Sequence, residues 1–305
     1  AVATADSPPL AQKERYKVGF SQMESNNPWR IAETKSFHDT AESCNWDLIA
    51  TDAAGSAAKQ VADVDSMIAQ GIDVLFLPPR EEKPLIPAVK KAKAAGIPTF
   101  LVDRSVDPAA ATAGEDFVAF LGSDFIDQGR RVAQWTAENF KGEKGVIVEL
   151  EGTTGSSPAN DRKKGFDDEI AKDPRFTIVA SQTGDFARDM GRQVMETLLQ
   201  AHPDVNIVYA HNDEMAIGAI QALELAGRKP GEDVLVVSID GTRDALQAIF
   251  DGKMGVTVES SPFFGPLACE VMKRYAAGET IEPWVQVKDR IFTQANAAEN
   301  IDEAY

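Results

Sequence analysis

The feature that most constrains this chain is a regular alternation of short apolar stretches with longer stretches of helical periodicity. The apolar stretches, which we expect to be strands, are residues 16–20, 46–51, 73–78, 99–103, 117–122, 145–150, 176–181, 205–210, 234–239, 255–259 and 284–287. The stretches between them have apolar residues three and four apart, and several end at a glycine, as at Gly71, Gly96 and Gly227. Alternation of this kind is typical of α/β proteins with parallel sheets.

The number of expected strands bears on the number of domains. This is more strands than a single open sheet usually contains. The 305 residues suffice for two domains of roughly 100 to 150 residues each. We therefore predict two doubly wound domains. The division is expected within residues 121–124, because the strand predicted at 117–122 follows the one at 99–103 with no helix between them.

The net charge of −17 limits the partners of the chain. Acidic residues outnumber basic ones by 48 to 31, and this excess repels the phosphates of nucleic acids and anionic lipid surfaces. No run of about 18 apolar residues is present, so no membrane-spanning helix is expected. The chain begins AVATAD, without a methionine, a basic segment or an apolar segment, and we interpret it as the mature form of an exported protein whose signal peptide has been removed.

The two cysteines, Cys44 and Cys269, provide neither a multi-bridge disulfide framework nor a four-thiolate metal site. Their simplest interpretation is a pair of buried free thiols. One disulfide is the alternative in an oxidising compartment, and the sequence does not decide between the two.

Polar and aromatic side chains gather where the predicted strands end. In open α/β sheets, ligands bind beyond the carboxyl ends of the strands, so these positions hold the candidate ligand-binding residues. They are Asn27, Trp29, Arg30, Asp103, Arg104, Arg162, Phe186, Asn212, Asp240 and Glu259.

Each of these residues also has a purely structural interpretation. Asparagine and aspartate cap helices, and Asn27 stands directly before Pro28, which suits the first helical position. The same role is open to Asp103, Asn212 and Asp240. The arginines and the glutamate can be exposed charges, and the phenylalanine can belong to the core.

Taken together, the candidates suit a small polyhydroxylated ligand. The apolar face of a sugar ring stacks on tryptophan or phenylalanine, and each hydroxyl is held between a carboxylate and a guanidinium or amide. Trp29 is then the stacking platform, Arg30 an edge contact, and Asn27 either a helix cap or a third contact. Three arginines stand against three carboxylates in this set, and the balance favours an uncharged ligand.

Sequence signatures of enzymes are absent or weak. No dinucleotide-binding glycine motif, phosphate-binding loop of the P-loop type, nucleophile elbow or zinc-protease motif is present. Of the three histidines, His211 stands at a predicted strand end, but no nucleophile accompanies it. We therefore expect no catalytic residues, no metal and no cofactor.

Several segments, taken as a set, resemble the periplasmic sugar-binding proteins of ABC transporters, in particular the ribose-binding-like group. They are VGFSQMESNNPWRIAE, QGIDVLFLPP, GIPTFLVDRS, DRKKGF, SQTGDFARDMGRQVM, YAHNDEMAIGAIQAL and VVSIDGTRDALQAI, and the similarity extends over residues 16–292. Within that group, the galactofuranose-binding members are most similar, through GFSQ, WR, VELEGT and DRKKGF.

The resemblance implies a type I periplasmic binding protein, with two α/β lobes joined by three hinge crossings near Gly122, Ser260 and Lys288. The expected N-terminal lobe comprises residues 16–122 and 260–288, and the C-terminal lobe residues 123–259 and 289–305. The resemblance also implies that a neutral monosaccharide binds in the cleft between the lobes, at the candidate residues named above. The expected protein is a monomer of the Gram-negative periplasm that delivers the sugar to an ABC transporter permease.

Two other functions remain open on the sequence alone. The sensing domain of a sugar-responsive transcription regulator shares this architecture, but it needs an attached helix-turn-helix, which we do not expect in the residues before position 16. A sugar-converting enzyme is the second alternative, with strand-end carboxylates as acid and base. Stoichiometric binding without turnover would exclude the enzyme.

Overall fold

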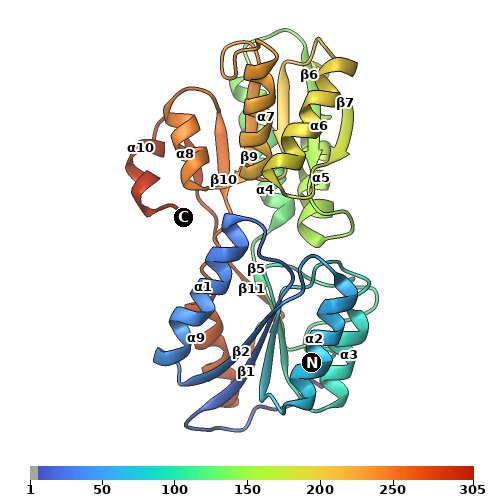
Figure 1. The fold of residues 1–305 in the computed structure, drawn as a ribbon, viewed down its shortest axis with the longest axis vertical. Helices are drawn as coiled ribbons and strands as arrows, with labels where there is room; N and C mark the ends of the chain where they lie inside the picture. Colours follow the sequence, from blue (N-terminus) through green and yellow to red (C-terminus); the bar gives the residue numbers. More distant parts are fainter. Residues whose placement is uncertain (1–5) are drawn as a thin grey trace. The chain divides into compact units, whose positions relative to one another are not determined.

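The computed structural model describes residues 6–305 and divides into two compact units. The first unit extends to Ser123 and adds Gly155–Ser157 and Pro262–Val287, and the second consists of Asp124–Thr154, Pro158–Ser261 and Lys288–Tyr305. Each unit is built on its own largely parallel sheet, which confirms the predicted fold class (Figure 1). The interpretation of the N-terminus as a processed one falls on residues 1–5, outside the described residues. In the part that is described, no helix is long and apolar enough to cross a membrane.

The sheet of the first unit has six strands in the order β11-β5-β4-β3-β1-β2, and all neighbours run parallel. They are β1 (Tyr16–Gln22), β2 (Trp46–Asp52), β3 (Val74–Leu77), β4 (Thr99–Val102), β5 (Ala119–Gly122) and β11 (Trp284–Gln286). β3 and β4 are buried along their whole length, as central strands of a parallel sheet covered on both faces must be.

Helices cover both faces of this sheet (Figure 1). α1 (Pro28–Ser43) and α9 (Gly265–Ala276) pack together on one face, and α2 (Ala57–Ala69) and α3 (Ile86–Ala94) pack together on the other. Because α1, α2 and α3 each follow a parallel strand of this sheet, their N-termini lie at the edge where those strands end.

The two faces of this sheet bury different kinds of side chain. Toward α1 the core is aromatic, with the Phe37 ring centre 4.0 Å from that of Phe20 and 5.5 Å from that of Phe76. Toward α2 and α3 it is mainly aliphatic, and it includes Val64 and Val89, both fully buried. These layers hold β1 and β4 rigidly, and both strands lead into candidate residues.

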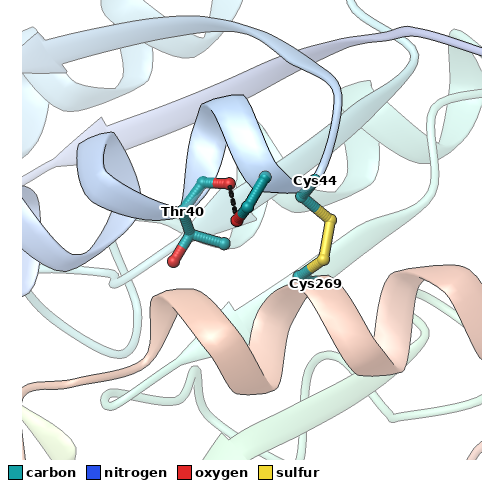
Figure 2. Close-up of a disulfide and its surroundings, with 4 residues drawn as sticks. Thr40, Cys44 and Cys269 are labelled. Carbon is teal, nitrogen blue, oxygen red and sulfur yellow. Dashed lines mark hydrogen bonds between the residues drawn. A yellow bond between two sulfur atoms is a disulfide. The ribbon is translucent and has the colours of Figure 1, made fainter.

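A disulfide joins Cys44 to Cys269, so the expectation of two free thiols is wrong (Figure 2). Cys44 caps the end of α1 and Cys269 lies within α9, with the two Cα atoms 6.1 Å apart. Both cysteines belong to the first unit, although 225 positions separate them in the sequence. The sequence left the pairing open because it depends on α9, which returns to the first unit after most of the second unit has been completed.

The sheet of the second unit also has six strands, in the order β12-β10-β9-β8-β6-β7. They are β6 (Gly145–Glu151), β7 (Phe176–Thr183), β8 (Ile207–Ala210), β9 (Leu235–Asp240), β10 (Val256–Glu259) and β12 (Ile291–Thr293). Neighbours are parallel except β10 and β12, which are antiparallel. β12 is missing from the strands expected from sequence, because its residues IFT do not alternate, whereas β11, which is equally short, lies in the alternating stretch WVQV.

Helices cover both faces of the second sheet as well. α6 (Arg188–Ala201), α7 (Asp213–Leu225) and α8 (Arg243–Phe250) pack on one face, and α4 (Phe125–Asn139) and α5 (Ser157–Ile170) on the other. The last elements, α10 (Ala297–Asn300) and η1 (Ile301–Glu303), pack against α8.

Candidate functional site

Asn27 fixes the start of α1 at the carboxyl end of β1. Its Oδ1 accepts a hydrogen bond from Arg30 N at 3.0 Å, and Pro28 occupies the first helical position. The helix-cap interpretation of Asn27 is therefore confirmed. The first turn that it caps carries Trp29 and Arg30, and both are buried.

Arg30 is the centre of a buried ion-pair cluster in the first unit. Its Nη1 donates to Glu33 Oε2 at 2.8 Å, and its Nη2 donates to Asp103 Oδ2 at 2.5 Å. Its guanidinium carbon lies 4.3 Å from the centre of the Trp29 ring, within cation–π range. The structure thus brings Trp29, Arg30 and Asp103 together and adds Glu33 to them.

Asp103 and Arg104 follow β4. Asp103 has φ +61°, an uncommon conformation for a residue with a side chain, of the kind that concentrates at functional sites. Arg104 is 2% exposed, its Nη1 donates to Arg80 O at 2.8 Å, and its Nε lies 4.0 Å from Asp103 Oδ2. The interpretation of Arg104 as a solvated arginine is therefore wrong.

The charges of this cluster shift one another's pKa values. Burial disfavours the charged guanidinium of Arg30, but Asp103 and Glu33 outweigh it and raise its pKa. Burial raises the pKa of Glu33 to about 7, against the attraction of Arg30. Burial, and then the like charge of Arg30, lower the pKa of Arg104 to about 9. Both arginines are protonated at neutral pH, so the cluster offers guanidinium donors beside carboxylate acceptors.

Arg162, on α5, organises the candidates of the second unit. Its helix lies close to α4, because a Cβ added to Gly129 would overlap Arg162 O. Its Nε donates to Gln128 Oε1 at 2.9 Å and its Nη1 to His211 O at 2.6 Å. Its Nη2 donates to Asp240 Oδ1 at 3.3 Å. Arg162 is 4% exposed, so its interpretation as an exposed helix charge is wrong.

Phe186 and Asn212 lie beside Arg162. The Phe186 ring centre is 5.8 Å from the guanidinium carbon, and Phe186 O accepts from Asn212 Nδ2 at 3.1 Å. Asn212 Oδ1 accepts from Met215 N at 3.0 Å, which confirms its role as the cap of α7. Phe186 is buried in the core under α6 and α7, so its core interpretation is also confirmed. Neither role prevents a ligand contact, because both residues stay adjacent to Arg162.

Asp240 ends β9 with an unusual backbone conformation, φ +140°. It does not cap α8, because Thr242 does so by accepting from Ala245 N at 3.2 Å, and the helix-cap interpretation of Asp240 is wrong. Asp213 stabilises the turn that follows Asp240. Its Oδ2 accepts a hydrogen bond from Thr242 N at 2.8 Å, and its Oδ1 accepts one from Thr257 Oγ1 at 2.7 Å. Burial raises the pKa of Asp213 to about 6, against these hydrogen bonds.

Glu259 has a different partner. Its Oε1 accepts from Arg290 Nη2 at 2.7 Å, and its Oε2 accepts from Arg290 Nε at 2.9 Å. The structure thus pairs Glu259 with an arginine outside the predicted set. Arg290 directly precedes β12, the strand that was not predicted.

His211 is buried and held at both ring nitrogens. Nδ1 accepts from Gly152 N at 3.2 Å, and Nε2 lies 2.7 Å from Glu149 Oε1, so the neutral ring donates from Nε2 to the carboxylate. Burial opposes the ionisation of Glu149, but hydrogen bonds from His211 and Lys163 outweigh it and lower the pKa of Glu149 to about 2. A histidine held in this way is a structural residue rather than a general base.

Three residues outside the predicted set hold the predicted ones in place, namely Glu33, Gln128 and Asp213. The spacing of Glu33, three residues after Arg30 on one helix, would have indicated a pair. Gln128 and Asp213 carry no comparable signal, because their contacts depend on how separate elements pack. Among residues 6–305, no group of three or more histidine, cysteine or acidic side chains could hold a metal ion.

The family model described as the periplasmic binding protein domain matches residues 18–280. The galactofuranose-binding protein YtfQ of Escherichia coli (strain K12) is 37% identical over 290 residues, which cover 94% of this chain and 90% of that protein.

Solved structures give similar matches. A Mycobacterium smegmatis protein in complex with β-D-fucofuranose is 41% identical, with a TM-score of 0.90 and 94% of each chain covered. The periplasmic binding protein component of the arabinose ABC transporter from Shewanella sp. ANA-3, bound to α- and β-L-arabinofuranose, is 38% identical, with a TM-score of 0.87 and coverage of 94% of this chain and 95% of that one. Because the family match and these relatives extend over most of its length, this chain belongs to the periplasmic binding protein family.

Proposed function

We propose that this chain is the solute-binding component of a sugar ABC transporter and delivers one neutral monosaccharide to the membrane permease. The observation that carries the proposal is a matching set of groups in each unit, a buried arginine paired with an aspartate beside an aromatic ring. In the first unit the pair is Arg30 and Asp103, and in the second it is Arg162 and Asp240. Such groups hold sugar hydroxyls and stack on a sugar ring.

The charges of the two sets favour an uncharged ligand. In the first set, Glu33 and Asp103 both pair with Arg30, and Asp103 Oδ2 lies 4.0 Å from Arg104 Nε. In the second set, Arg162 is matched by Asp240. Glu259 is neutralised separately by Arg290. A uronic acid or a sugar phosphate would add a buried anion that no surplus arginine compensates.

The ring form of the sugar is suggested by the relatives. The three named above bind, by their names, galactofuranose, β-D-fucofuranose and arabinofuranose, all of them five-membered rings. We therefore propose an aldose in its furanose form, galactofuranose or a related sugar, as the ligand of this chain.

Both units are proposed to contribute contacts to one sugar in the cleft between them. The proposed contacts are Asn27, Trp29, Arg30, Asp103, Arg104, Arg162, Phe186, Asn212, Asp240 and Glu259. The proposed hinge crossings near Gly122, Ser260 and Lys288 are supported by three of the positions at which the chain passes from one compact unit to the other, and the short segment Gly155–Ser157 adds a further passage. The sugar favours closure of the units only by its differential affinity for the closed state, because its polar contacts are complete only there.

Family membership places the chain outside the cytoplasm, and its disulfide accords with an oxidising compartment. We propose the periplasm of a Gram-negative bacterium as the location, a monomer as the working form, and the permease as its protein partner. Nucleic acid is not a proposed partner, because the net charge is −17. We propose binding without turnover, since the buried histidine of the second unit is held at both nitrogens.

A thermal-shift screen of ligand-stripped, refolded protein tests the proposed function. The panel contains neutral pentoses and hexoses, their furanose-locked methyl glycosides, uronic acids and nucleotides. A sugar present at a hundredfold its dissociation constant stabilises the folded protein by about 2.7 kcal/mol. We expect a shift with one or two neutral furanoses, confirmed by calorimetry, and unchanged sugar after prolonged incubation. A response confined to charged ligands, or no response, contradicts the proposal.

A further inference from the structure

Glu24, which follows β1 in the first unit, is a buried carboxylate outside the proposed contacts. It is 3% exposed. Two main-chain hydrogen bonds fix the chain around it to a neighbouring turn, from Ala53 N to Gln22 O and from Gly55 N to Met23 O, both at 2.9 Å. The position of Glu24 is therefore set by the backbone and not by a mobile loop.

One oxygen of this carboxylate lacks a hydrogen-bond donor. Glu24 Oε1 is buried and has no hydrogen-bond partner among residues 6–305. A buried polar atom left in this state destabilises the folded protein, so native proteins satisfy nearly all such atoms. The oxygen is suited to a donor that arrives with a ligand.

The other oxygen shows where the side chain lies. A Cβ added to Gly55 would stand 3.3 Å from Glu24 Oε2 and 3.8 Å from Arg80 Nε, so the carboxylate and this arginine lie on the same side of the turn. Gly55 has φ +77°, and a larger residue would be strained there as well as crowded. The turn thus keeps the space beside Glu24 clear.

Glu24 also belongs electrostatically to the ion-pair cluster of the first unit. Burial opposes the charge of Arg30, and Glu24 acts with Asp103 to raise the pKa of that arginine. Burial lowers the pKa of Arg104, and Glu24 partly offsets that effect. Arg104 is also linked to Arg80, the arginine beside Glu24, because its Nη1 donates a hydrogen bond to the main-chain oxygen of Arg80 at 2.8 Å. Arg80, which lies beside Glu24 at Gly55, is itself paired with Glu81, whose Oε1 is 3.2 Å from Arg80 Nη1.

We propose that Glu24 is a further ligand-contacting residue, whose Oε1 accepts a hydrogen bond from one hydroxyl of the bound sugar and thereby selects for that hydroxyl. This inference rests on the proposed function, because it takes the ligand to be a neutral sugar. A hydroxyl is the donor that such a sugar supplies. A site built to bond a hydroxyl rejects the analogue that lacks it, because the buried oxygen is then left unpaired.

The test uses the full chain and calorimetry with the sugar that gives the thermal shift, together with each of its monodeoxy analogues and its uronic acid. Binding by the wild type tests the proposed function, and the variants Glu24→Ala and Glu24→Gln test the role of Glu24. Glu115→Gln, at an exposed glutamate of the same unit, is the matched control.

We expect Glu24→Ala to weaken binding of the parent sugar about tenfold or more. The deoxy analogue that lacks the selected hydroxyl should bind the wild type and Glu24→Ala with equal affinity. Glu24→Gln, which removes one negative charge from the cluster, should bind the uronic acid several times more tightly than the wild type does. Wild-type affinity in Glu24→Ala, or an equal loss for every deoxy analogue, overturns the proposal. If Glu24→Ala does not fold, the near-isosteric Glu24→Gln provides the test. An affinity of this variant for the uronic acid no higher than that of the wild type then overturns the proposal.

Discussion

Arg162 and Asp240 form a buried ion pair in the second unit, with Arg162 Nη2 3.3 Å from Asp240 Oδ1. The arginine comes from α5 and the aspartate from the end of β9, where its backbone is held at φ +140°. A conformation of this kind persists only where the surroundings over-determine it, and here Asp213 and Thr257 do so. Donor and acceptor are thus ordered before a ligand arrives, which lowers the entropic cost of binding.

Asp240→Ala is expected to weaken sugar binding by at least about 2 kcal/mol, because it leaves a buried guanidinium without its carboxylate partner. Arg104→Ala should have an effect of the same size in the first unit. Titration calorimetry measures the loss, and circular dichroism verifies the fold. Wild-type affinity in either folded variant would remove that residue from the site.

Glu259→Ala is expected to cost less than about 1 kcal/mol of binding free energy, because the carboxylate is already paired with a half-exposed arginine, Arg290. The same titrations measure it, with Asp240→Ala as the comparison. A loss as large as that of Asp240→Ala would contradict the prediction and would show that Glu259 contributes as much to sugar binding as Asp240 does.

Trp29→Ala is expected to weaken sugar binding by about 1 kcal/mol or more through lost stacking, whereas Trp29→Phe should retain most of the affinity. The indole also covers the guanidinium of Arg30. Calorimetric titration measures the sugar affinity of each variant, and quenching of tryptophan fluorescence by the sugar measures the contact of the sugar with Trp29. Unchanged titrations in Trp29→Ala would exclude it from the site.

Stability at acid pH should depend on Glu149. Its pKa in the folded protein, about 2, lies below the ordinary value of 4.5, so its contribution to the free energy of unfolding is present above pH 4.5 and is lost as the pH falls toward 2. The full contribution is about 3 kcal/mol. Urea unfolding should therefore show that Glu149→Gln destabilises most at pH 5 to 7 and progressively less toward pH 2. A destabilisation that does not change with pH would contradict the prediction.

Removal of the disulfide should destabilise the protein without abolishing sugar binding. In the chain-entropy model, a bridge across 225 residues stabilises by about 5 kcal/mol. The double variant Cys44→Ala/Cys269→Ala should unfold at lower urea concentration than the oxidised wild type. Reduced wild type is the control and should behave like the variant. Equal midpoints for the oxidised wild type and the double variant would show that the bridge adds no stability.

The regular elements of this fold could be predicted because their signals are local. Helix periodicity gave α2 and α3, and Gly71 and Gly96 indeed end them with φ +75°, the left-handed conformation that glycine favours. β12 and the disulfide were not predictable in this way. The disulfide depends on α9, which returns to the first unit late in the sequence, and β12 is short and has no alternating pattern of its own.

The candidate site shows the same limit. The rule that ligands bind at strand ends selected Arg30 and Asp103 separately, and the structure joins them in one ion pair. The rule also selected Glu259, which the structure pairs with Arg290 instead. Sequence position therefore predicts which edge of a sheet a side chain occupies. Its partner there depends on tertiary packing, as the contact of Arg162 with Gln128 illustrates.

The return of α9 and β11 to the first unit also governs how a newly made chain can mature. Until residue 286 has been synthesised, β5 lacks its neighbour β11 and is an open edge that can pair with other chains. The second unit is likewise unfinished until its closing segment, Lys288–Tyr305, has been made. The first unit therefore cannot be completed until nearly all of the second has been made, and the second is completed only after the first. A chain truncated by even a few dozen residues should thus fail as a whole, and quality control has to protect nearly the entire polypeptide before any part of it is safe from aggregation.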